Sequence, residues 1–297
     1  MTHKVALAYL HGMGDQPPDF ADDTFAELKS RFANHIRNVH PNNPQEELVT
    51  AGVHWAPVFA NIQGTLWQRL IAGGDMDWRK ARRFMVHFLG DAAGYQPNSG
   101  STGRYEEVHR IVARGFHNLK DEAGPDAPLA VMAHSLGAMI ASNYIWDLQK
   151  PNLLDPAVLA EMGVTNLASA SPLEQGKTFT LFFTLGTTIP VWSLRYSNPD
   201  FGTPIAVPAP GLLPPYSTLP AGWWNFYDVD DILGYPLREL NALYQAVVTE
   251  DVEVSVGSFF TGWSPLSHTS YDEDRNVLGP IALKLAQTWR TMNGFPP

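Results

Sequence analysis

The chain has 297 residues, of which 44% are hydrophobic and 17% charged, a composition typical of one sizeable globular domain. Its formal net charge of −10 argues against nucleic acid or an anionic membrane surface as the main partner. The chain contains no cysteine, which excludes disulfides, a thiolate nucleophile and cysteine-ligated zinc.

The first apolar run, residues 5–10, is too short for the hydrophobic region of a signal peptide. No stretch approaches the roughly 20 apolar residues that a transmembrane helix needs. We therefore expect a cytoplasmic protein without stable membrane insertion. The sequence leaves the oligomeric state open.

Short apolar segments alternate with amphipathic ones along most of the chain. This alternation predicts an α/β fold, with a mostly parallel central sheet covered by helices on both faces. The expected strands are residues 4–10, 48–55, 128–133, 178–185, 223–227 and 252–256. The expected helices of this sheet are residues 20–36, 105–119, 136–148 and 275–292.

Two segments interrupt the alternation. Residues 57–103 contain two aromatic-rich helical stretches, at 62–71 and 78–89. Residues 187–222 are rich in Pro and Gly and are too long for an ordinary connection. We expect a single domain over residues 1–297, with a cap insertion at 57–103 and a Pro-rich cap or lid at 187–222. Both segments are expected to fold over the mouth of the site.

A serine follows the expected strand at residues 128–133. The segment Val131-Met132-Ala133-His134-Ser135-Leu136-Gly137 resembles the nucleophile elbow G-x-S-x-G, with Ala133 in place of the first glycine. The elbow needs small residues on either side because strand and helix approach closely there, and the sharp turn exposes the serine Oγ. Alanine still satisfies that steric demand. Ser135 is therefore the candidate nucleophile.

A glycine-rich loop, Leu10-His11-Gly12-Met13-Gly14-Asp15, follows the first expected strand. It resembles the oxyanion loop of lipases and esterases, whose backbone amides stabilise the charge on a carbonyl oxygen. The resemblance implies that the amides of Met13 and Leu136 are the donors. Gly12 and Gly14 allow a close approach to substrate, and His11 braces the loop. A phosphate cradle is the alternative, but neither G-K-[ST] nor G-x-G-x-x-G is present.

Of the ten histidines, only His268 lies after Ser135. In the α/β-hydrolase family that these motifs resemble, the triad runs serine, acid, histidine along the chain. The resemblance therefore makes His268 the general base. It lies in a loop, residues 263–271, after the last expected strand and before the final helix. Imidazole suits this role because its pKa lies near working pH.

The same resemblance places the triad acid after the expected strand at 223–227, where Asp228, Asp230 and Asp231 follow. Asp230 fits best, because Asp, one further residue and then two apolar residues is the usual arrangement. Asp231 is the second choice and Asp228 the third. A calcium or zinc site made from these carboxylates is an alternative, although no H-E-x-x-H or other ligand spacing accompanies them. We expect no metal.

In order along the chain, these motifs resemble the lipase and esterase branch of the α/β-hydrolase superfamily. The resemblance implies a serine hydrolase that cleaves a small-molecule carboxylic ester through an acyl-enzyme, without a cofactor. Aromatic residues in the two insertions suggest an apolar acyl or alcohol pocket, or else only the core of a cap: Trp67, Trp78, Phe84, Phe88 and Trp192. A thioesterase or amidase of the same fold, and a catalytically silent binding protein, remain alternatives.

Overall fold

The computed structural model describes residues 2–14, 16–40, 42–96, 103–150, 154–196, 201–212, 214–257, 268 and 270–297. Within them, six strands form one sheet: β1 (Val5–Leu10), β2 (Leu48–Val53), β3 (Leu129–His134), β4 (Phe179–Leu185), β5 (Gly222–Asp228) and β6 (Val248–Val254). The strand order is β2-β1-β3-β4-β5-β6, and every pairing is parallel. The expected α/β architecture is confirmed, and in the described residues the sheet is wholly parallel.

The central strands are buried along their whole length, whereas the edge strand carries charges. Every residue of β1, β3 and β4 is buried, as a parallel sheet with both faces covered requires. At the edge, β6 carries Glu250, Asp251 and Glu253, which are exposed or partly exposed. Charged side chains discourage further strand pairing at an edge. Because of these charged residues, the sequence predicted a strand only at 252–256 and missed the first half of β6.

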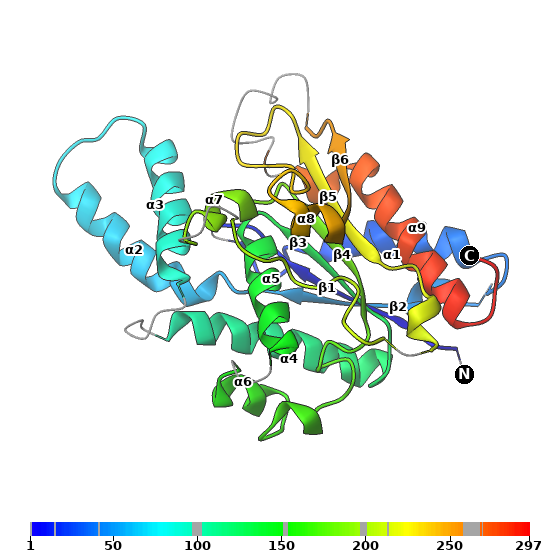
Figure 1. Cartoon of the computed structure of the whole chain (residues 1–297). Helices are drawn as coiled ribbons and strands as arrows, with labels where there is room; N and C mark the ends of the chain where they lie inside the picture. The colour runs from blue at the N-terminus through cyan, green and yellow to red at the C-terminus, as the bar shows by residue number, and fades with distance from the viewer. Residues whose placement is uncertain are drawn as a thin grey trace.

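Helices cover both faces of the sheet (Figure 1). α4 (Arg104–Ala123) and α5 (Leu136–Gln149) pack on one face, and α1 (Asp22–Ile36) and α9 (Arg275–Met292) pack on the other. Alternate residues of β1 enter the two cores because successive side chains of a strand point to opposite faces. All four helices were expected. The short helices α6 (Pro156–Glu161), α7 (Ile189–Ser193) and α8 (Ala242–Val247) were not, since each is too short to show a helical period.

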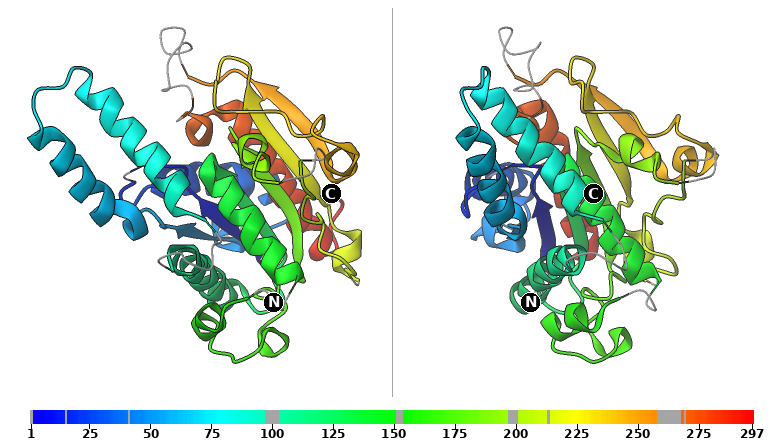
Figure 2. Two further views of the ribbon diagram at one scale, coloured as in Figure 1. Left: turned by 60° about the vertical axis from the view of Figure 1, so that its left-hand side comes forward. Right: turned by 90° about the vertical axis from the view of Figure 1, so that its left-hand side faces the viewer.

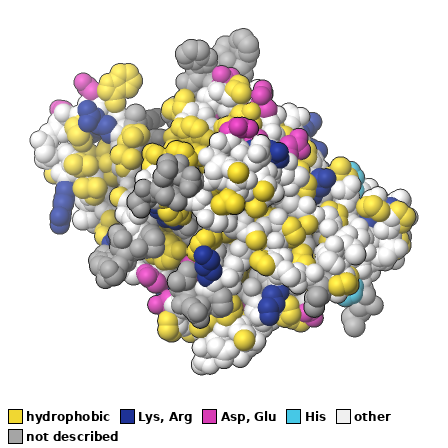
Figure 3. Space-filling view, viewed as in Figure 1, with side chains coloured by type: hydrophobic (Ala, Val, Ile, Leu, Met, Phe, Trp, Pro, Cys, Tyr) yellow, Lys and Arg dark blue, Asp and Glu magenta, His cyan; other side chains and the backbone are white. Residues whose placement is uncertain are grey.

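The first insertion forms a helical hairpin, α2 (Pro57–Ala72) and α3 (Arg79–Gly94), that projects away from the sheet (Figures 1 and 2). The chain leaves the sheet after β2 and returns at Tyr95, which is fully buried in the main core. Apolar side chains on the hairpin are exposed, as the space-filling view also shows (Figure 3): Ile62, Leu66, Leu70, Trp78, Met85 and Leu89. The insertion is therefore helical, as expected, and stands out from the body of the domain.

The Pro-rich segment at 187–222 is not a single lid. Only its first part, α7, directly follows β4 at the carboxyl edge of the sheet. Three later residues are buried in the same core as α5: Ile205, Val207 and Ala209. Gln149 at the end of α5 exchanges two hydrogen bonds with the backbone of Ala206, of 2.8 and 3.0 Å. Since α5 ends at the amino edge, the expectation that all of 187–222 covers the site mouth is wrong for residues 205–209.

The first turn of α5 packs directly against the end of β1 at Gly137. A Cβ atom there would lie 2.6 Å from the carbonyl oxygen of Leu10 and closer still to that of His11. Backbone atoms cannot move aside as a flexible side chain can. Gly137→Ala is therefore expected to lower the free energy of unfolding by about 1–3 kcal/mol, as overpacking does, and chemical denaturation measures this.

Gly64→Ala, in the middle of α2, is the matched control, because nothing lies within 4 Å of its added Cβ. Alanine there should raise the free energy of unfolding by up to about 1 kcal/mol through helix propensity. Equal effects of the two substitutions would contradict the close approach at Gly137.

Candidate active site

Ser135 occupies the sharp turn between β3 and α5. Its φ of 53° and ψ of −123° lie in a region that non-glycine residues rarely adopt. Its N–H donates to the carbonyl oxygen of Leu185 at 2.9 Å, which ties the turn to the end of β4. The turn lies where the strand order reverses, between β1 and β3. In α/β proteins, ligands bind in the crevice at such a switch point.

Three side chains from three separate loops form one line of hydrogen bonds. Ser135 Oγ lies 2.7 Å from His268 Nε2, and His268 Nδ1 lies 2.8 Å from Asp231 Oδ2. All three residues are buried. A nucleophile, a base and a carboxylate that orients the base are related in this way in serine hydrolases. The remainder of the expected histidine loop, 263–267 and 269, lies outside the described residues.

The carboxylate that contacts His268 is Asp231, so the preference for Asp230 is wrong. The side chain of Asp230 is exposed, and its backbone N–H donates to Asp228 Oδ1 at 2.9 Å. Asp228 Oδ2 accepts from the N–H of Val256 at 2.7 Å, so Asp228 joins the ends of β5 and β6. In this tight turn successive side chains point in different directions, and only that of Asp231 reaches the imidazole.

Tyr271 supports Asp231, a role that sequence reasoning missed. Its hydroxyl donates to Asp231 Oδ2 at 2.9 Å and accepts from the N–H of Asp228 at 2.8 Å. Burial raises the pKa of Asp231, but hydrogen bonds from His268, the Leu233 amide and Tyr271 outweigh burial and hold the pKa below its ordinary value. Asp231 is therefore ionised at neutral pH. The only signal in the sequence was that Tyr271 follows His268 by three residues.

The loop after β1 approaches the serine turn very closely. A Cβ atom on Gly12 would lie 2.8 Å from His134 Nδ1 and 3.0 Å from Ser135 Cβ. His11 braces the loop from inside: its Nδ1–H donates to the carbonyl oxygen of Gly12 at 2.6 Å, and its Nε2 accepts from the N–H of Trp55 at 3.2 Å. Burial lowers the pKa of His11 to about 3, so its imidazole stays neutral and can accept.

His134, the residue before the serine, holds the backbone of His268. Its Nε2–H donates to the carbonyl oxygen of His268 at 2.6 Å, and the two rings pack with centroids 4.9 Å apart. Burial and, to a lesser degree, the neighbouring charge of His268 lower the pKa of His134 to about 3. His134 is therefore a neutral positioning residue. Its place before the serine gave no indication of this role.

A cavity of about 310 Å³ opens beside Ser135. That volume lies at the lower end of the range of about 300–1,000 Å³ for small-molecule sites. Met13 and Gly12 line it together with Ser135 and His268. The structure thus brings the expected oxyanion loop and the serine turn to one cavity. Leu136, the other expected donor, is the first residue of α5.

The aromatic residues of the insertions do not gather around Ser135. Trp67 and Trp78 line an apolar cavity of about 480 Å³ in the α2–α3 hairpin. Trp192 is partly buried and packs from α7 against the main core. The side chains of Phe84 and Phe88 lie outside the part of the chain that the structure describes. The three described aromatics therefore do not form a pocket at the serine, and Trp78, which is 81% exposed, does not form a cap core either.

Gly14 ties the loop after β1 to the base of the hairpin. Its N–H donates to Asp91 Oδ2 at 3.1 Å, and Asp91 Oδ1 accepts from the side-chain amide of Gln63. Asp91 is only 2% exposed, and burial raises its pKa to about 6 against the weaker opposing effect of these two neutral donors. The carboxyl group that anchors the loop therefore changes charge just below neutral pH.

Across the described ranges, no group of three or more His, Asp or Glu side chains is placed to hold a metal ion. Of the helices described, none is both long and apolar enough to cross a membrane. Comparison with protein-family models and with curated proteins finds no match to this chain. The geometry of the site is therefore the basis for assigning a function.

Because the pKa of Asp91 is raised in the folded chain, we expect the stability of the protein to depend on pH. The folded chain holds this proton up to about pH 6, whereas the ordinary value is 3.8, so the folded state binds the proton more tightly than the unfolded state. The contribution of Asp91 to stability is therefore lost as pH rises from about 4 to 6 and stays lost above 6. At about 1.4 kcal/mol per pKa unit, the loss is on the order of 3 kcal/mol.

Asp91→Asn should lack this step, because asparagine does not ionise. Denaturation midpoints at pH 4 and pH 7 measure the step in the wild type and in the variant. Asp230→Asn, at an exposed carboxylate, is the control. Its stability should change between pH 4 and pH 7 by the same amount as that of the wild type. If the wild type and Asp91→Asn lose the same stability over this interval, the pKa of Asp91 is not raised.

Proposed function

We propose that the chain is a serine hydrolase that cleaves a carboxylic ester through an acyl-enzyme intermediate. One observation carries the proposal: Ser135, His268 and Asp231 are joined by hydrogen bonds of 2.7 and 2.8 Å at a strained turn at the carboxyl edge of the sheet. The serine follows β3, the carboxylate follows β5, and the histidine follows β6. This is the order of triad residues in α/β-hydrolases.

An α/β-hydrolase fold is part of the same proposal. The parallel sheet, the helices on both faces and the inserted hairpin support it. One feature differs, because hydrolase sheets usually include an antiparallel strand and the six described strands are all parallel. This difference in the described sheet does not affect the site, since the strands that carry the proposed triad are β3, β5 and β6.

In the first half of the reaction, His268 Nε2 accepts the hydroxyl proton of Ser135 as Oγ attacks the ester carbonyl carbon. The carbonyl oxygen becomes an oxyanion, which the amides of Met13 and Leu136 stabilise by hydrogen bonds. The tetrahedral intermediate collapses as the bond to the leaving alcohol breaks. His268 gives its proton to that alcohol, and the acyl group stays on Ser135 as an ester.

In the second half, His268 accepts a proton from water as the water oxygen attacks the acyl carbon. Collapse of this intermediate releases the acid and returns the proton to Ser135. Ionised Asp231 accepts the Nδ1–H of His268 throughout, which fixes the tautomer and stabilises the imidazolium. His134 does not compete for the proton, because its pKa of about 3 keeps it neutral.

The geometry does not fix the leaving group, and a thioester or an amide would meet the same nucleophile. Matched p-nitrophenyl esters, thioesters and anilides distinguish these substrates by their kcat/KM. We expect the ester to be turned over fastest. Labelling with a fluorophosphonate probe separates all of these enzymes from a silent binding protein, which would not react.

Ser135→Ala is expected to abolish fluorophosphonate labelling and to lower kcat by roughly a million-fold, the scale for loss of a triad nucleophile. Ser169→Ala, at an exposed serine away from the site, is the control and should label normally. Circular dichroism should show that both variants keep their helices and strands. Retained labelling of Ser135→Ala would end the serine-hydrolase proposal.

Asp231→Asn is expected to lower kcat by around ten-thousand-fold, because an amide can favour the wrong tautomer of His268. Asp230→Asn is the matched control one residue away, and its kcat should stay within about tenfold of the wild type, since its exposed side chain does not reach the imidazole. Steady-state kinetics with one p-nitrophenyl ester measures both. A large defect in Asp230→Asn with an active Asp231→Asn would reverse the assignment.

A further inference from the structure

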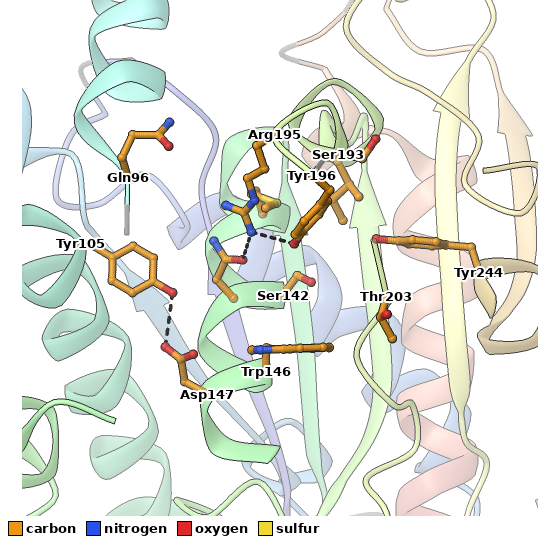
Figure 4. Close-up of a pocket in the computed structure, with 13 residues that line it drawn as sticks. Gln96, Tyr105, Ser142, Trp146, Asp147, Ser193, Arg195, Tyr196, Thr203 and Tyr244 are labelled. Carbon is orange, nitrogen blue, oxygen red and sulfur yellow. Dashed lines mark hydrogen bonds between the residues drawn. The ribbon is translucent and has the colours of Figure 1, made fainter. Parts of the chain in front are cut away.

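A second cavity, of about 500 Å³, runs along α5 (Figure 4). One wall is a single face of α5, with side chains at the three- and four-residue spacing of neighbours on a helix: Met139, Ser142, Asn143, Trp146 and Asp147. The facing walls come from α7 and the residues after it, from the start of α4 and from α8. The cavity is therefore built from segments far apart in the sequence.

One end of this cavity lies about one helical turn from the nucleophile. Met139 follows Ser135 by four residues along α5. Ile189 follows Leu185 by four residues, and Leu185 pairs with His134 at the carboxyl edge of the sheet. Met139 and Ile189 are both buried. Met139 is therefore the residue of this cavity nearest along the chain to Ser135, and the cavity is lined by other residues than the one beside Ser135.

The cavity contains a cation, Arg195, whose hydrogen-bond partners are neutral. Its guanidinium donates to Asn143 Oδ1 at 3.2 Å and to the hydroxyl of Tyr196 at 2.9 Å, and it lies 5.0 Å from the centre of the Tyr196 ring. Figure 4 shows it directed into the cavity beside Tyr196. In the described part of the chain, no salt bridge joins Arg195 to a carboxylate. A guanidinium fork matches the two oxygens of a carboxylate.

A buried line of hydrogen bonds holds the partner of Arg195 in place. The side-chain amide of Asn143 donates to the hydroxyl of Tyr95 at 3.2 Å, and that hydroxyl donates to His109 Nε2 at 2.8 Å. His109 Nδ1 lies 3.2 Å from Asp147 Oδ2. The residues that present Arg195 are thus fixed before any ligand binds, as a specific site requires.

The cavity contains two residues of opposite charge, Asp147 and Arg195, and they differ in the partners that they already have. Asp147 is buried, and one of its oxygens already accepts from Tyr105 at 3.3 Å in addition to its contact with His109. Arg195 is exposed: burial and, next, Tyr196 raise the pKa of Tyr244, and the charge of Arg195 opposes that rise. At Tyr105, Asp147 adds to the rise in pKa that burial causes, and its effect exceeds the opposing one of Arg195. The Arg195 end therefore favours an added negative charge.

We propose that this cavity binds the acyl part of the substrate and that Arg195 binds a carboxylate at the far end of the acyl chain. This inference rests on the proposed function of Ser135. Asn143, which holds Arg195, lies eight residues beyond Ser135, or about 12 Å along a helix axis. The substrate class is then a monoester of a medium-length dicarboxylic acid, whose apolar middle passes Met139 and Ile189 between Ser135 and Arg195.

The test compares p-nitrophenyl esters of equal length that differ only at the acyl end: octanoate, the monoester of suberic acid, and the ester with a terminal ammonium group. The wild type should have its highest kcat/KM on the suberate monoester. Arg195→Gln should lower kcat/KM on that ester about 10- to 100-fold more than on octanoate, the range for one charged hydrogen bond. Arg37→Gln, at an exposed arginine directly after α1, should change neither rate.

Binding without turnover gives an independent readout. The monomethyl ester of suberate should bind Ser135→Ala in calorimetry more tightly than methyl octanoate does, and adding Arg195→Gln should remove that difference. An equal loss on both esters, or a preference for the ammonium ester, would overturn the carboxylate site. If no ester is cleaved but the monomethyl ester of suberate binds through Arg195, the proposed function fails and the cavity assignment stands. If esters are cleaved and Arg195→Gln has no selective effect, the cavity assignment fails alone.

Discussion

The close approach of the β1 loop to the serine turn is the constraint on which the rest of the site depends. Gly137 lets α5 meet the carbonyl oxygens of Leu10 and His11, and Gly12 lets the loop meet His134 and Ser135. A side chain at either glycine would push the loop away from the nucleophile. The same contact fixes the ring of His134, which holds the backbone of His268. Two glycines thus set the positions of both the loop after β1 and His268.

Two buried aspartates near the site have pKa values displaced in opposite directions, and their partners explain the difference. Asp231 accepts hydrogen bonds from an imidazole, a tyrosine hydroxyl and a backbone amide, and together they outweigh burial. Asp91 has only a backbone amide and a glutamine side chain, and burial prevails. The aspartate that stays charged contacts His268, the proposed base. The aspartate that titrates near pH 6 anchors the loop through Gly14.

The strands and the turn at Ser135 could be predicted from local patterns, but the contacts between distant segments could not. Apolar runs marked β1, β3 and β4, and the small residues around Ser135 marked the turn. The choice among three aspartates failed because spacing along the chain does not tell which side chain of a tight turn points inward. Tyr271 and His134 were missed because their partners are 40 and 134 residues away. The cavity at Arg195 left no local signal, since several separate segments build it.

The end of α3 joins the two parts of the proposed site. Asp91, in its last turn, binds the N–H of Gly14 in the oxyanion loop. Tyr95, which caps the same helix, accepts from Asn143, the residue that holds Arg195. Because four residues separate Asp91 from Tyr95, a shift of the hairpin base would disturb both hydrogen bonds together. Reaction and acyl selection would then respond to the same movement, although they depend on different side chains of α5 and its neighbours.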